Sequence, residues 1–466
     1  MEKQNKQKRV ADLGKDPVGP LLLRLALPTI CAQVVNLLYN IVDRIYIGQI
    51  PVEGKLALTG MGVTFPVITL ISAFAALIGM GGAPRASIAM GAGEHKKAER
   101  TLGTCTAALW GMAIALTVLF LLFQEPLLVL FGASSDTLPY AMQYLNIYVL
   151  GTIFVMTALG LNGFITAQGK SDVAMKTVLI GAVLNVVLDP VFIFVFGLGV
   201  RGAAIATVIS QAVSALWVVR FLTGRKSTLR LKRAFFRLDK RLLLPAIALG
   251  ASPFVMQSTE SLLTVTFNVS LQKYGGDLAV GAMTILTSVA QMVQMPLMGL
   301  TQGAQPILSF NYGAKRPDRM KQTVRYNLLG ACVFAFAVWA LAMIAPHTLA
   351  RLFAHDSALI DETAWALRIY FAVGFVSAFQ NTFQQCFVAL GEAKISLFLA
   401  LERKIILLIP MILILPHFFE DKLFAVFFAE PVADLLAAAT TTTLFLIRFR
   451  QILRSISVDK DKEITS

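Results

Sequence analysis

The chain has 466 residues, of which 56% are hydrophobic and only 15% are charged, and its mean hydropathy is +0.71. A soluble protein carries about 25% charged residues, and the apolar runs here are long enough to cross about 30 Å of hydrocarbon, so the composition excludes a soluble globular protein. The net charge of +14 is compatible with nucleic-acid binding, but the basic residues follow a membrane-topology pattern, and we expect no nucleic-acid partner.

Twelve apolar segments predict twelve transmembrane helices, and therefore an all-α polytopic membrane protein embedded in a lipid bilayer. The runs lack the period-two alternation of barrel strands, so each is expected to be helical. The predicted spans are 18–49, 55–90, 97–123, 138–168, 172–197, 201–222, 241–272, 277–311, 320–345, 360–390, 394–416 and 422–449. The 17 residues before the first span are polar and contain no apolar h-region, so we expect no cleaved signal peptide.

The Lys and Arg residues are distributed unevenly between the two sides of these spans. The side that holds both termini receives 33 of the 41 basic residues, including those of "GEAKISLFLALERK". The opposite side receives seven, and Arg24 lies within the first span. By the positive-inside rule, this asymmetry places both termini in the cytoplasm.

The sequence repeats itself at a shift of about 222 residues. The repeat aligns Gly81 with Gly303, Pro84 with Pro306, Ser87 with Ser309, and Gly91 with Gly313. Six spans per repeat give both halves the same direction in the membrane, and transporters built in this way bind substrate between the repeats. We therefore predict two pseudo-symmetric six-helix lobes. The predicted boundaries are a cytoplasmic N-terminal tail at 1–17, an N-lobe at 18–222, a basic cytoplasmic linker at 223–240, a C-lobe at 241–449 and a cytoplasmic C-terminal tail at 450–466.

Asp43 is the first acidic residue inside a predicted span. A charge at the bilayer centre costs about 2.5–3.5 kcal/mol on insertion scales, so such residues are candidates for function. In "NLLYNIVDRIYIG", Asp43 shares a helical stripe with Asn36, Tyr39 and Asn40, and a polar stripe on an apolar helix predicts a cavity. The alternative is an interfacial Asp43 that pairs with Arg44 or water.

The fifth span contains an acid and a proline together, in "LNVVLDPVFIF". Asn185 and Asp189 are four residues apart and share one helical face. Pro190 lacks an N–H group, so the helix is expected to bend there. Such oxygen ligands suit a proton relay or a Na⁺ site, to which the Thr207 hydroxyl could contribute from the sixth span. The alternatives are a helix that starts with Asp189 as N-cap, and a Thr207 bonded to its own helix.

The C-lobe contains three further acids, Glu260 in "MQSTESLL" and Glu430 and Asp434 in "FFAEPVADLLAAAT". Glu260 could couple to a cation or simply pair with a neighbouring hydroxyl or amide. Glu430 and Asp434 could titrate as a second pair or pack structurally, and the sequence does not choose between these roles. Gln257, one turn before Glu260, is predicted to face the cavity. We find no P-loop, His–Glu–x–x–His or Gly–x–Ser–x–Gly motif, so nothing supports an enzyme or an ATP-driven pump.

Three segments resemble the multidrug and toxic compound extrusion (MATE) family, most closely its bacterial MepA-like and DinF-like members. They are "VDRIYIG" at 42–48, "GMGGAPRASIAMGAGEHKKAE" at 79–99 and "LNVVLDPVFIFVFGLGVRGAAIAT" at 184–207. The resemblance covers both lobes. It implies a cation-coupled efflux transporter with a V-shaped pair of lobes in the bacterial inner membrane, acting as a monomer on cationic drugs or toxins. It also implies no cofactor beyond the coupling ion, H⁺ or Na⁺.

The resemblance also implies a site in the first lobe. In the DinF-like branch, a cation site combines an aspartate of the first helix, an Asn–x₃–Asp of the fifth and a threonine of the sixth. These residue types stand here as Asp43, Asn185, Asp189 and Thr207, while Asn36, Tyr39 and Asn162 match positions that line the cavity. The NorM-like branch uses acids of the seventh and tenth helices. Glu260 matches the first of these, but the tenth helix reads "FQNTFQQC", with amides instead of an aspartate, which favours the N-lobe site.

Asp189 is expected to be the main coupling group. Burial favours the neutral form of a carboxyl group, so protonation would remove the charge, relax the bend at Pro190 and shift the equilibrium between lobe arrangements. The central acids outnumber the central bases, which predicts cationic amphipathic substrates. Two alternatives remain within this frame: a lipid-linked oligosaccharide flippase, which would need arginines in the cavity, and a non-transporting receptor or scaffold.

Overall fold

The computed structural model describes residues 11–51, 54–354 and 356–465, with side chains described up to residue 458. These residues form helices and loops, with no strand among them. Residues 1–10 of the predicted N-terminal tail and Ser466 of the predicted C-terminal tail lie outside the described residues.

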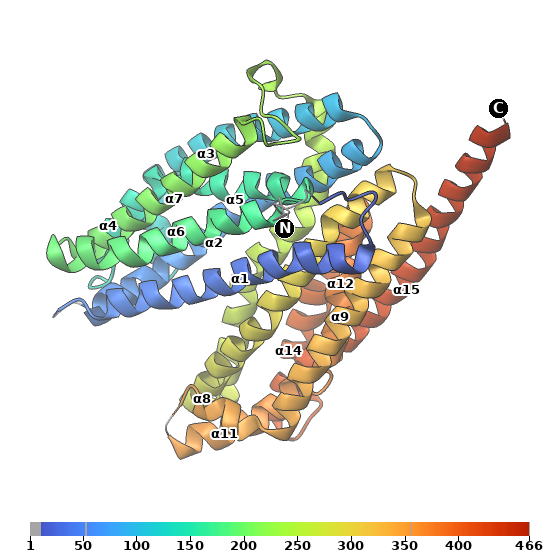
Figure 1. Ribbon diagram of the computed structural model, residues 1–466. Coiled ribbons are helices and arrows are strands. Elements are labelled where there is room, and N and C mark those ends of the chain that lie inside the picture. Colours follow the sequence, from blue (N-terminus) through green and yellow to red (C-terminus); the bar gives the residue numbers. More distant parts are fainter. Residues whose placement is uncertain (1–10, 52–53, 355, 466) are drawn as a thin grey trace, which may run out of the picture.

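The N-lobe is a bundle of helices around one hydrophobic core (Figure 1). Its helices are α1 (Val18–Gly48), α2 (Gly54–Gly91), α3 (His95–Leu130), α4 (Leu138–Leu150), α5 (Thr152–Ala167), α6 (Ser171–Pro190), the π-helical turn η1 (Val191–Val195) and α7 (Gly199–Thr223). α4 and α5 form one span that is bent by 58°. Large side chains such as Tyr144 and Phe164 fill the core, because the inward faces of the helices carry apolar and small residues.

The C-lobe repeats this arrangement with more irregular helices. They are α8 (Lys240–Gly313), α9 (Pro317–Ile344), α10 (Pro346–Arg351), α11 (Ser357–Tyr370), α12 (Ser377–Ala389), α13 (Ala393–Leu401), the π-helical η4 (Glu402–Leu408), α14 (Ile409–Ile414) and α15 (Lys422–Thr465). Short 3₁₀ turns lie at η2 (Arg233–Phe235), η3 (Gly374–Val376) and η5 (Leu415–His417). α8 contains two spans, which join at Gly276, where a positive φ of 63° breaks the helix.

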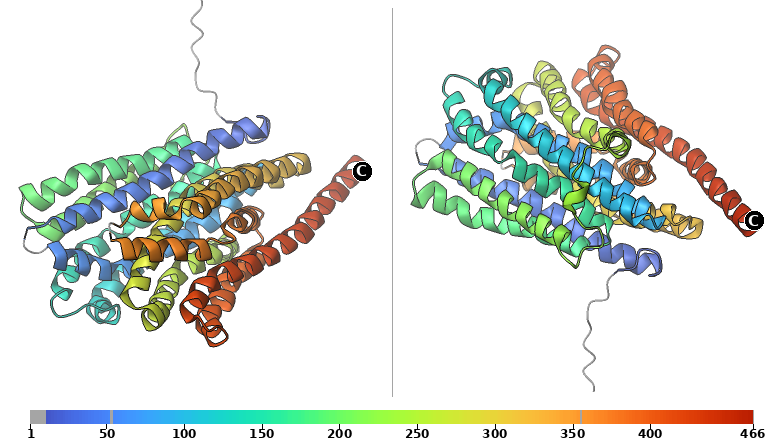
Figure 2. Two further views of the ribbon diagram at one scale, coloured as in Figure 1. Left: turned by 90° about the horizontal axis from the view of Figure 1, so that it is seen from below. Right: turned by 90° about the horizontal axis from the view of Figure 1, so that it is seen from above.

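The twelve predicted spans are confirmed among the described residues. Eight helices are long and apolar enough to cross a membrane, and the bent pair α4–α5 makes a ninth crossing. α8 crosses twice, because it is broken at Gly276, and so adds a tenth crossing. The broken helices α11–α12 and α13–η4–α14 supply the last two. α15 continues to Thr465, beyond the predicted end at 449, because a polar sequence ends an apolar span without ending a helix (Figure 2).

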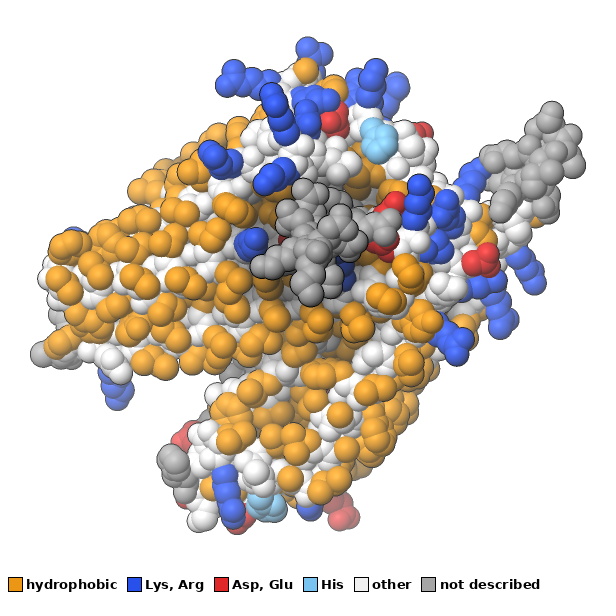
Figure 3. All heavy atoms as spheres, viewed as in Figure 1, with side chains coloured by type: hydrophobic (Ala, Val, Ile, Leu, Met, Phe, Trp, Pro, Cys, Tyr) orange, Lys and Arg blue, Asp and Glu red, His pale blue; other side chains and the backbone are white. Residues whose placement is uncertain are grey.

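The two lobes meet at one end and diverge at the other (Figure 1). Figure 3 shows Lys and Arg side chains gathered at the end where the lobes meet, while hydrophobic side chains cover the long walls of both lobes. We call this end the basic side; it includes the loops around Gly91, Gly169 and Gly313 and the linker 223–240. The distribution matches an apolar belt in lipid with a basic rim at one interface.

A reciprocal pair of glycines joins the lobes near the basic side. A Cβ atom on Gly91 would lie 1.9 Å from the carbonyl oxygen of Phe310, and one on Gly313 would lie 1.9 Å from that of Ile88. Gly91 and Gly313 are equivalent positions of the repeat, as are Ile88 and Phe310. The backbones of α2 and α8 therefore touch at a point of internal symmetry, where no side chain fits.

The N-terminal segment 11–17 crosses from one lobe to the other on the basic side. The carbonyl oxygen of Leu13 accepts hydrogen bonds from Asn311 (2.9 Å) and Arg319 (3.0 Å) of the C-lobe. The buried Leu13 side chain packs against the turn at Gly169 of the N-lobe, where an added Cβ would lie 3.1 Å from Leu13 Cδ2. This segment, which we call the strap, therefore contacts both lobes.

The linker 223–240 is attached to the surface of the N-lobe. Gln168 Oε1 accepts three hydrogen bonds, from the Ser227 hydroxyl (3.0 Å) and from the amides of Thr228 (2.8 Å) and Leu229 (3.1 Å). Leu229 is fully buried. The linker therefore belongs physically to the N-lobe, and only its last residues bridge to α8.

Replacing Gln168 with alanine is expected to release the linker. The substitution leaves buried donors without an acceptor, which costs about 1–3 kcal/mol for a buried polar group. Trypsin cleavage at the exposed Arg225 and Lys226 should accelerate several-fold in detergent, as followed by gel electrophoresis. Gln49→Ala is the matched control, because Gln49 is an exposed glutamine that follows α1 and does not contact the linker; equal cleavage rates in both variants would contradict the attachment.

Candidate functional site

Three helices of the N-lobe bring the four predicted site residues into one buried cluster. Asn185 Nδ2 of α6 donates to Asp189 Oδ1 (3.2 Å) and to Thr207 Oγ1 of α7 (3.2 Å). The carboxyl group of Asp43, on α1, lies beside that of Asp189, close enough for one to hydrogen-bond the other when they share a proton. Asp43 is 3% exposed and Asp189 is fully buried, so two carboxyl groups lie together out of contact with water.

The cluster contains acceptor oxygens that no protein group satisfies. Asp43 Oδ1, Asn185 Oδ1 and Asp189 Oδ2 are buried and have no hydrogen-bond partner. Buried polar atoms are normally paired, so these three oxygens from two helices retain the capacity to accept a hydrogen bond or to ligate a small cation. Asn185 and Thr207 supply neutral oxygens of the kind that Na⁺ accepts, and carboxylates supply the negative charge.

No basic residue of the described chain forms an ion pair with these two carboxyl groups. Arg44, next to Asp43, points its guanidinium over the Phe65 ring, 5.6 Å from the ring centre. The alternative of an interfacial Asp43 paired with Arg44 is therefore wrong. The N-lobe cluster retains a formal negative charge when both acids are ionised.

Pro190 changes the type of helix immediately after Asp189. Asp189 lies inside α6, so the alternative in which it starts a helix as N-cap is wrong. Beyond the proline, the chain forms the π-helical η1, in which the Phe196 amide bonds to the Val191 carbonyl at 2.9 Å. The proline cannot donate to the preceding turn, and the wider π turn absorbs the lost bond. At the proline that was predicted to bend the helix, the structure thus has a π turn adjacent to the acid, and α6 and η1 together form one continuous span.

Tyrosines form one wall of the N-lobe cluster. Tyr39 and Tyr144 lie close to Thr207. Tyr144 stacks on Tyr148 with ring centres 5.9 Å apart, and both rings are buried. Tyr39 was predicted here from its stripe, but Tyr144 and Tyr148 were not. The signal for them was the spacing of four between the tyrosines of "YAMQYLNIY", which places them on one helical face.

The other predicted cavity residues lie outside the hydrogen bonds of this cluster. Asn40 is exposed and donates to the Asn36 carbonyl (2.7 Å). Asn162 donates to the Ala174 carbonyl (3.2 Å), and its own oxygen is buried without a partner. Gln257 is half-buried on α8 in the other lobe. These residues therefore contribute to the polar interior without joining the site.

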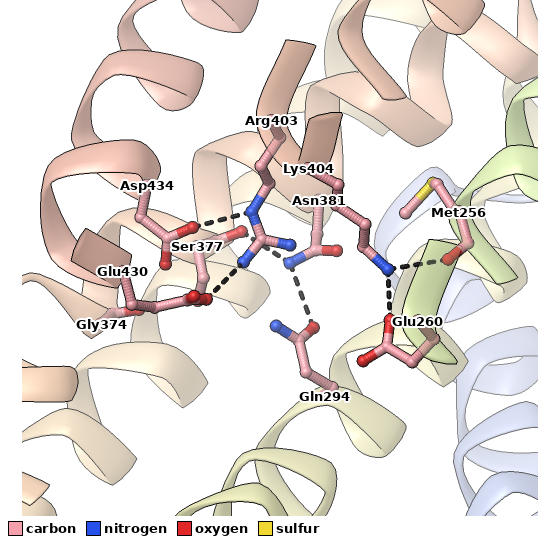
Figure 4. A network of polar contacts seen from close by, with 10 residues as sticks. All are labelled: Met256, Glu260, Gln294, Gly374, Ser377, Asn381, Arg403, Lys404, Glu430 and Asp434. Atoms are coloured by element: carbon pink, nitrogen blue, oxygen red, sulfur yellow. Dashed lines mark hydrogen bonds and ion pairs between the residues drawn. The ribbon is translucent and has the colours of Figure 1, made fainter. Parts of the chain in front are cut away.

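The C-lobe acids are bound to two basic residues, Arg403 and Lys404, on η4 (Figure 4). Arg403 Nε donates to Asp434 Oδ1 (2.7 Å), and its Nη2 donates to Glu430 Oε1 (3.2 Å). Lys404 Nζ bonds to Glu260 and donates to the Met256 carbonyl (2.7 Å). The alternative in which Glu260 pairs with a neighbouring hydroxyl or amide is therefore wrong.

The sequence assigned Arg403 and Lys404 to a basic loop, and that assignment is also wrong. Both lie at the middle of the predicted span 394–416, although the positive-inside count had assigned them to a cytoplasmic loop. Buried bases occur there because acids on α8 and α15 pair with them. The excess of central acids that favoured cationic substrates is accordingly confined to the N-lobe pair and to the Arg403 cluster, where one guanidinium faces two carboxylates, whereas Lys404 balances Glu260.

The two C-lobe contacts differ in exposure. The side chains of Arg403, Glu430 and Asp434 are 19%, 7% and 15% exposed, so this cluster is buried. Lys404 is 8% exposed, whereas the Glu260 side chain is 61% exposed. Removing one partner of a buried ion pair costs about 3–5 kcal/mol, while an exposed pair contributes about 0–1 kcal/mol. The Arg403 cluster is therefore a buried network of ion pairs, and the Glu260 carboxylate is accessible.

Comparisons with known proteins agree with this architecture. A family model described as MatE matches residues 28–191 and 253–416, one match in each lobe. Multidrug export protein MepA of Staphylococcus haemolyticus (strain JCSC1435) is 24% identical over 418 residues, which cover 89% of this chain and 91% of that protein. MepA of Staphylococcus aureus (strain NCTC 8325 / PS 47) is 24% identical over 440 residues, covering 94% and 95%.

Solved structures show the same fold. A structure described as the outward-facing conformation of a multidrug resistance MATE family transporter of the MOP superfamily aligns with a TM-score of 0.88 at 23% identity, covering 96% of this chain and all of that one. A MOP superfamily transporter from Pyrococcus furiosus, described as having a binding pocket of reversed polarity, also aligns with a TM-score of 0.88 at 23% identity, covering 96% and 99%.

Proposed function

This chain belongs to the MATE family of transporters, and we propose that it is a multidrug exporter driven by a cation gradient. The MepA relatives named as multidrug export proteins support this activity. Both lobes alternate between arrangements that open to opposite sides of the membrane. The substrates are cationic amphipathic compounds, and the coupling ion is H⁺ or Na⁺.

The basic side faces the cytoplasm in this proposal, with both termini, because Lys and Arg prefer that side of a bacterial inner membrane. The lobes diverge away from the basic side and leave a hollow between them (Figure 3), so this arrangement is open to the exterior. The strap and the glycine contact close the cytoplasmic end in this state.

The N-lobe acid pair is the observation that carries the proposal. Asp43 and Asp189 are buried side by side, have unpaired oxygens and lack a basic partner among the described residues. A proton would satisfy the pair by letting one carboxyl group donate to the other, and Na⁺ would use the same oxygens with those of Asn185 and Thr207. Either ion removes charge beside the π turn that follows Pro190, so occupancy can change how α6 packs against α1.

One coupling ion per cycle is sufficient for the transport task when its concentration gradient is large enough. Exchange of one H⁺ or Na⁺ for one monocation moves no net charge, so the membrane potential does not contribute, and a tenfold ion gradient supplies about 1.4 kcal/mol, which corresponds to about tenfold accumulation when coupling is tight. A buried acid pair that binds one cation per cycle can therefore drive export without a further energy source.

The alternative of a lipid-linked oligosaccharide flippase is less well supported. Such a protein needs free arginines to meet phosphate groups. The two central bases, Arg403 and Lys404, are both bound to carboxylates. A receptor or scaffold without transport is distinguished by experiment, because it would bind ligand without moving it.

The test is ethidium export from proteoliposomes containing the purified protein. A pH gradient and a Na⁺ gradient are imposed separately at zero membrane potential and then with a potential. Export that follows one gradient identifies the coupling ion. Gradient-independent binding with no counterflow would overturn the proposal in favour of a receptor or scaffold.

A further inference from the structure

The Glu260–Lys404 pair of the C-lobe has one member turned to the ligand-accessible interior and one member buried. We propose that Glu260 binds the positive charge of the substrate and that Lys404 is a built-in competitor which keeps that binding weak enough for release. Glu260 is thereby assigned as the group that contacts the substrate, which rests on the proposed function of exporting cationic compounds.

The position of Glu260 on α8 places it at the polar interior and not in lipid. Gln257, Glu260, Thr264 and Asn268 recur at helical spacing and form one polar face. A second face of α8, about a third of a turn away from the polar face, is suited to contact lipid. Its exposed apolar residues are Leu262 (53%), Val265 (58%) and Val269 (63%). An exposed carboxylate on the polar face is therefore offered to a ligand between the lobes.

Lys404 binds only one of the two carboxylate oxygens of Glu260. Its Nζ bonds to Oε2, while no described residue donates to Oε1. The same Nζ also donates to the Met256 carbonyl at 2.7 Å, so the ammonium keeps an acceptor when a ligand draws the carboxylate away (Figure 4). Glu260 can thus turn towards a substrate cation without leaving Lys404 unpaired.

The neighbouring Arg403 fixes the position of the competitor. Its guanidinium is held by Glu430 and Asp434 in a buried cluster, which anchors η4 next to Lys404. The Lys404 ammonium therefore stays within reach of Glu260 and repels a second positive charge that approaches the same carboxylate. Lys404 acts through Glu260, and so it is a positioning residue that sets cation affinity.

The test measures equilibrium binding of rhodamine 6G, a monocation, to the purified protein in detergent by fluorescence anisotropy, with no gradient. Lys404→Met removes the competing charge and should lower the Kd about tenfold. In proteoliposomes the same variant should show a lower KM and a lower kcat, because the substrate leaves slowly. Lys404→Arg keeps the charge and should retain values close to those of the wild type.

The double variant Glu260→Gln/Lys404→Met contains no buried unpaired charge and guards against simple misfolding. It should bind rhodamine 6G about tenfold more weakly than the wild type, while rhodamine B, a zwitterion at neutral pH, should bind equally to all variants. A raised or unchanged Kd in a folded Lys404→Met protein would overturn the role of Lys404. Retained tight binding in the double variant would overturn the role of Glu260. Failure of the wild type to bind rhodamine 6G at all would instead count against the proposed function.

Discussion

Replacing Asp189 with asparagine is expected to abolish gradient-driven export while leaving the protein folded. The amide has nearly the shape of the carboxyl group and keeps an oxygen to accept the bond from Asn185. It carries no exchangeable charge, however, so the cluster can no longer alternate between a charged and a neutral state. Under an imposed tenfold gradient of the coupling ion, the accumulation ratio of ethidium in proteoliposomes should fall from up to about tenfold, the limit for one-for-one exchange, to about one.

Asp172→Asn is the matched control for this prediction. Asp172 lies on the same helix, α6, but is exposed in its first turn, and its substitution should leave export unchanged. Asp43→Asn should reduce coupled export in the same direction as Asp189→Asn, because the two carboxyl groups form one site. Gradient-driven export by a folded Asp189→Asn variant would exclude Asp189 as the coupling group.

Adding a methyl group at Gly91 or Gly313 is expected to produce the largest loss of stability of any single small substitution proposed here. The new Cβ would lie 1.9 Å from a carbonyl oxygen of the opposite helix in each case, so the backbones of α2 and α8 must separate. Overpacking typically costs about 1–3 kcal/mol, and contact with rigid backbone should give a value at the upper end. Thermal unfolding in detergent, followed by tryptophan fluorescence, measures the effect.

Because each glycine meets a carbonyl oxygen of the other helix, the two substitutions are expected to have the same effect. Gly91→Ala and Gly313→Ala should cost similar free energies, since each glycine meets the carbonyl of the repeat-equivalent partner. Gly111→Ala on α3 is the control, because an added Cβ there meets no atom within 4 Å. Helix propensity favours alanine over glycine by about 1 kcal/mol, so the control should be neutral or slightly stabilised. Equal unfolding temperatures for all three variants would show that the lobes do not depend on this contact.

The spans and the N-lobe cluster could be predicted from sequence for a physical reason. Lipid requires long apolar segments, and it makes an intramembrane acid such as Asp189 too costly to retain without a role. The resemblance to a known family then connected Asp189 to Asp43 and Thr207, which lie on other helices. The structure brings these residues together as the resemblance implied, with the π turn at Pro190 as an added detail.

The C-lobe network could not be predicted in this way. Arg403 pairs with acids 27 and 31 positions later in the chain, and Lys404 pairs with an acid 144 positions earlier. No local spacing indicates partners so far apart, and the positive-inside count treats every base near an apolar run as a loop residue. The position of the two bases at the centre of a predicted span was the only sequence signal, and it indicated burial without identifying partners.

The strap has a consequence for how the protein is made. Leu13 emerges from the ribosome early, but its partners Asn311 and Arg319 are synthesised 298 and 306 residues later. At about 5–20 residues per second, the N-terminal segment waits roughly 15–60 s for its docking site. The strap is therefore docked long after it is synthesised, and joining of the two lobes at the basic side is a late step of biogenesis that a truncated chain ending before α8 cannot complete.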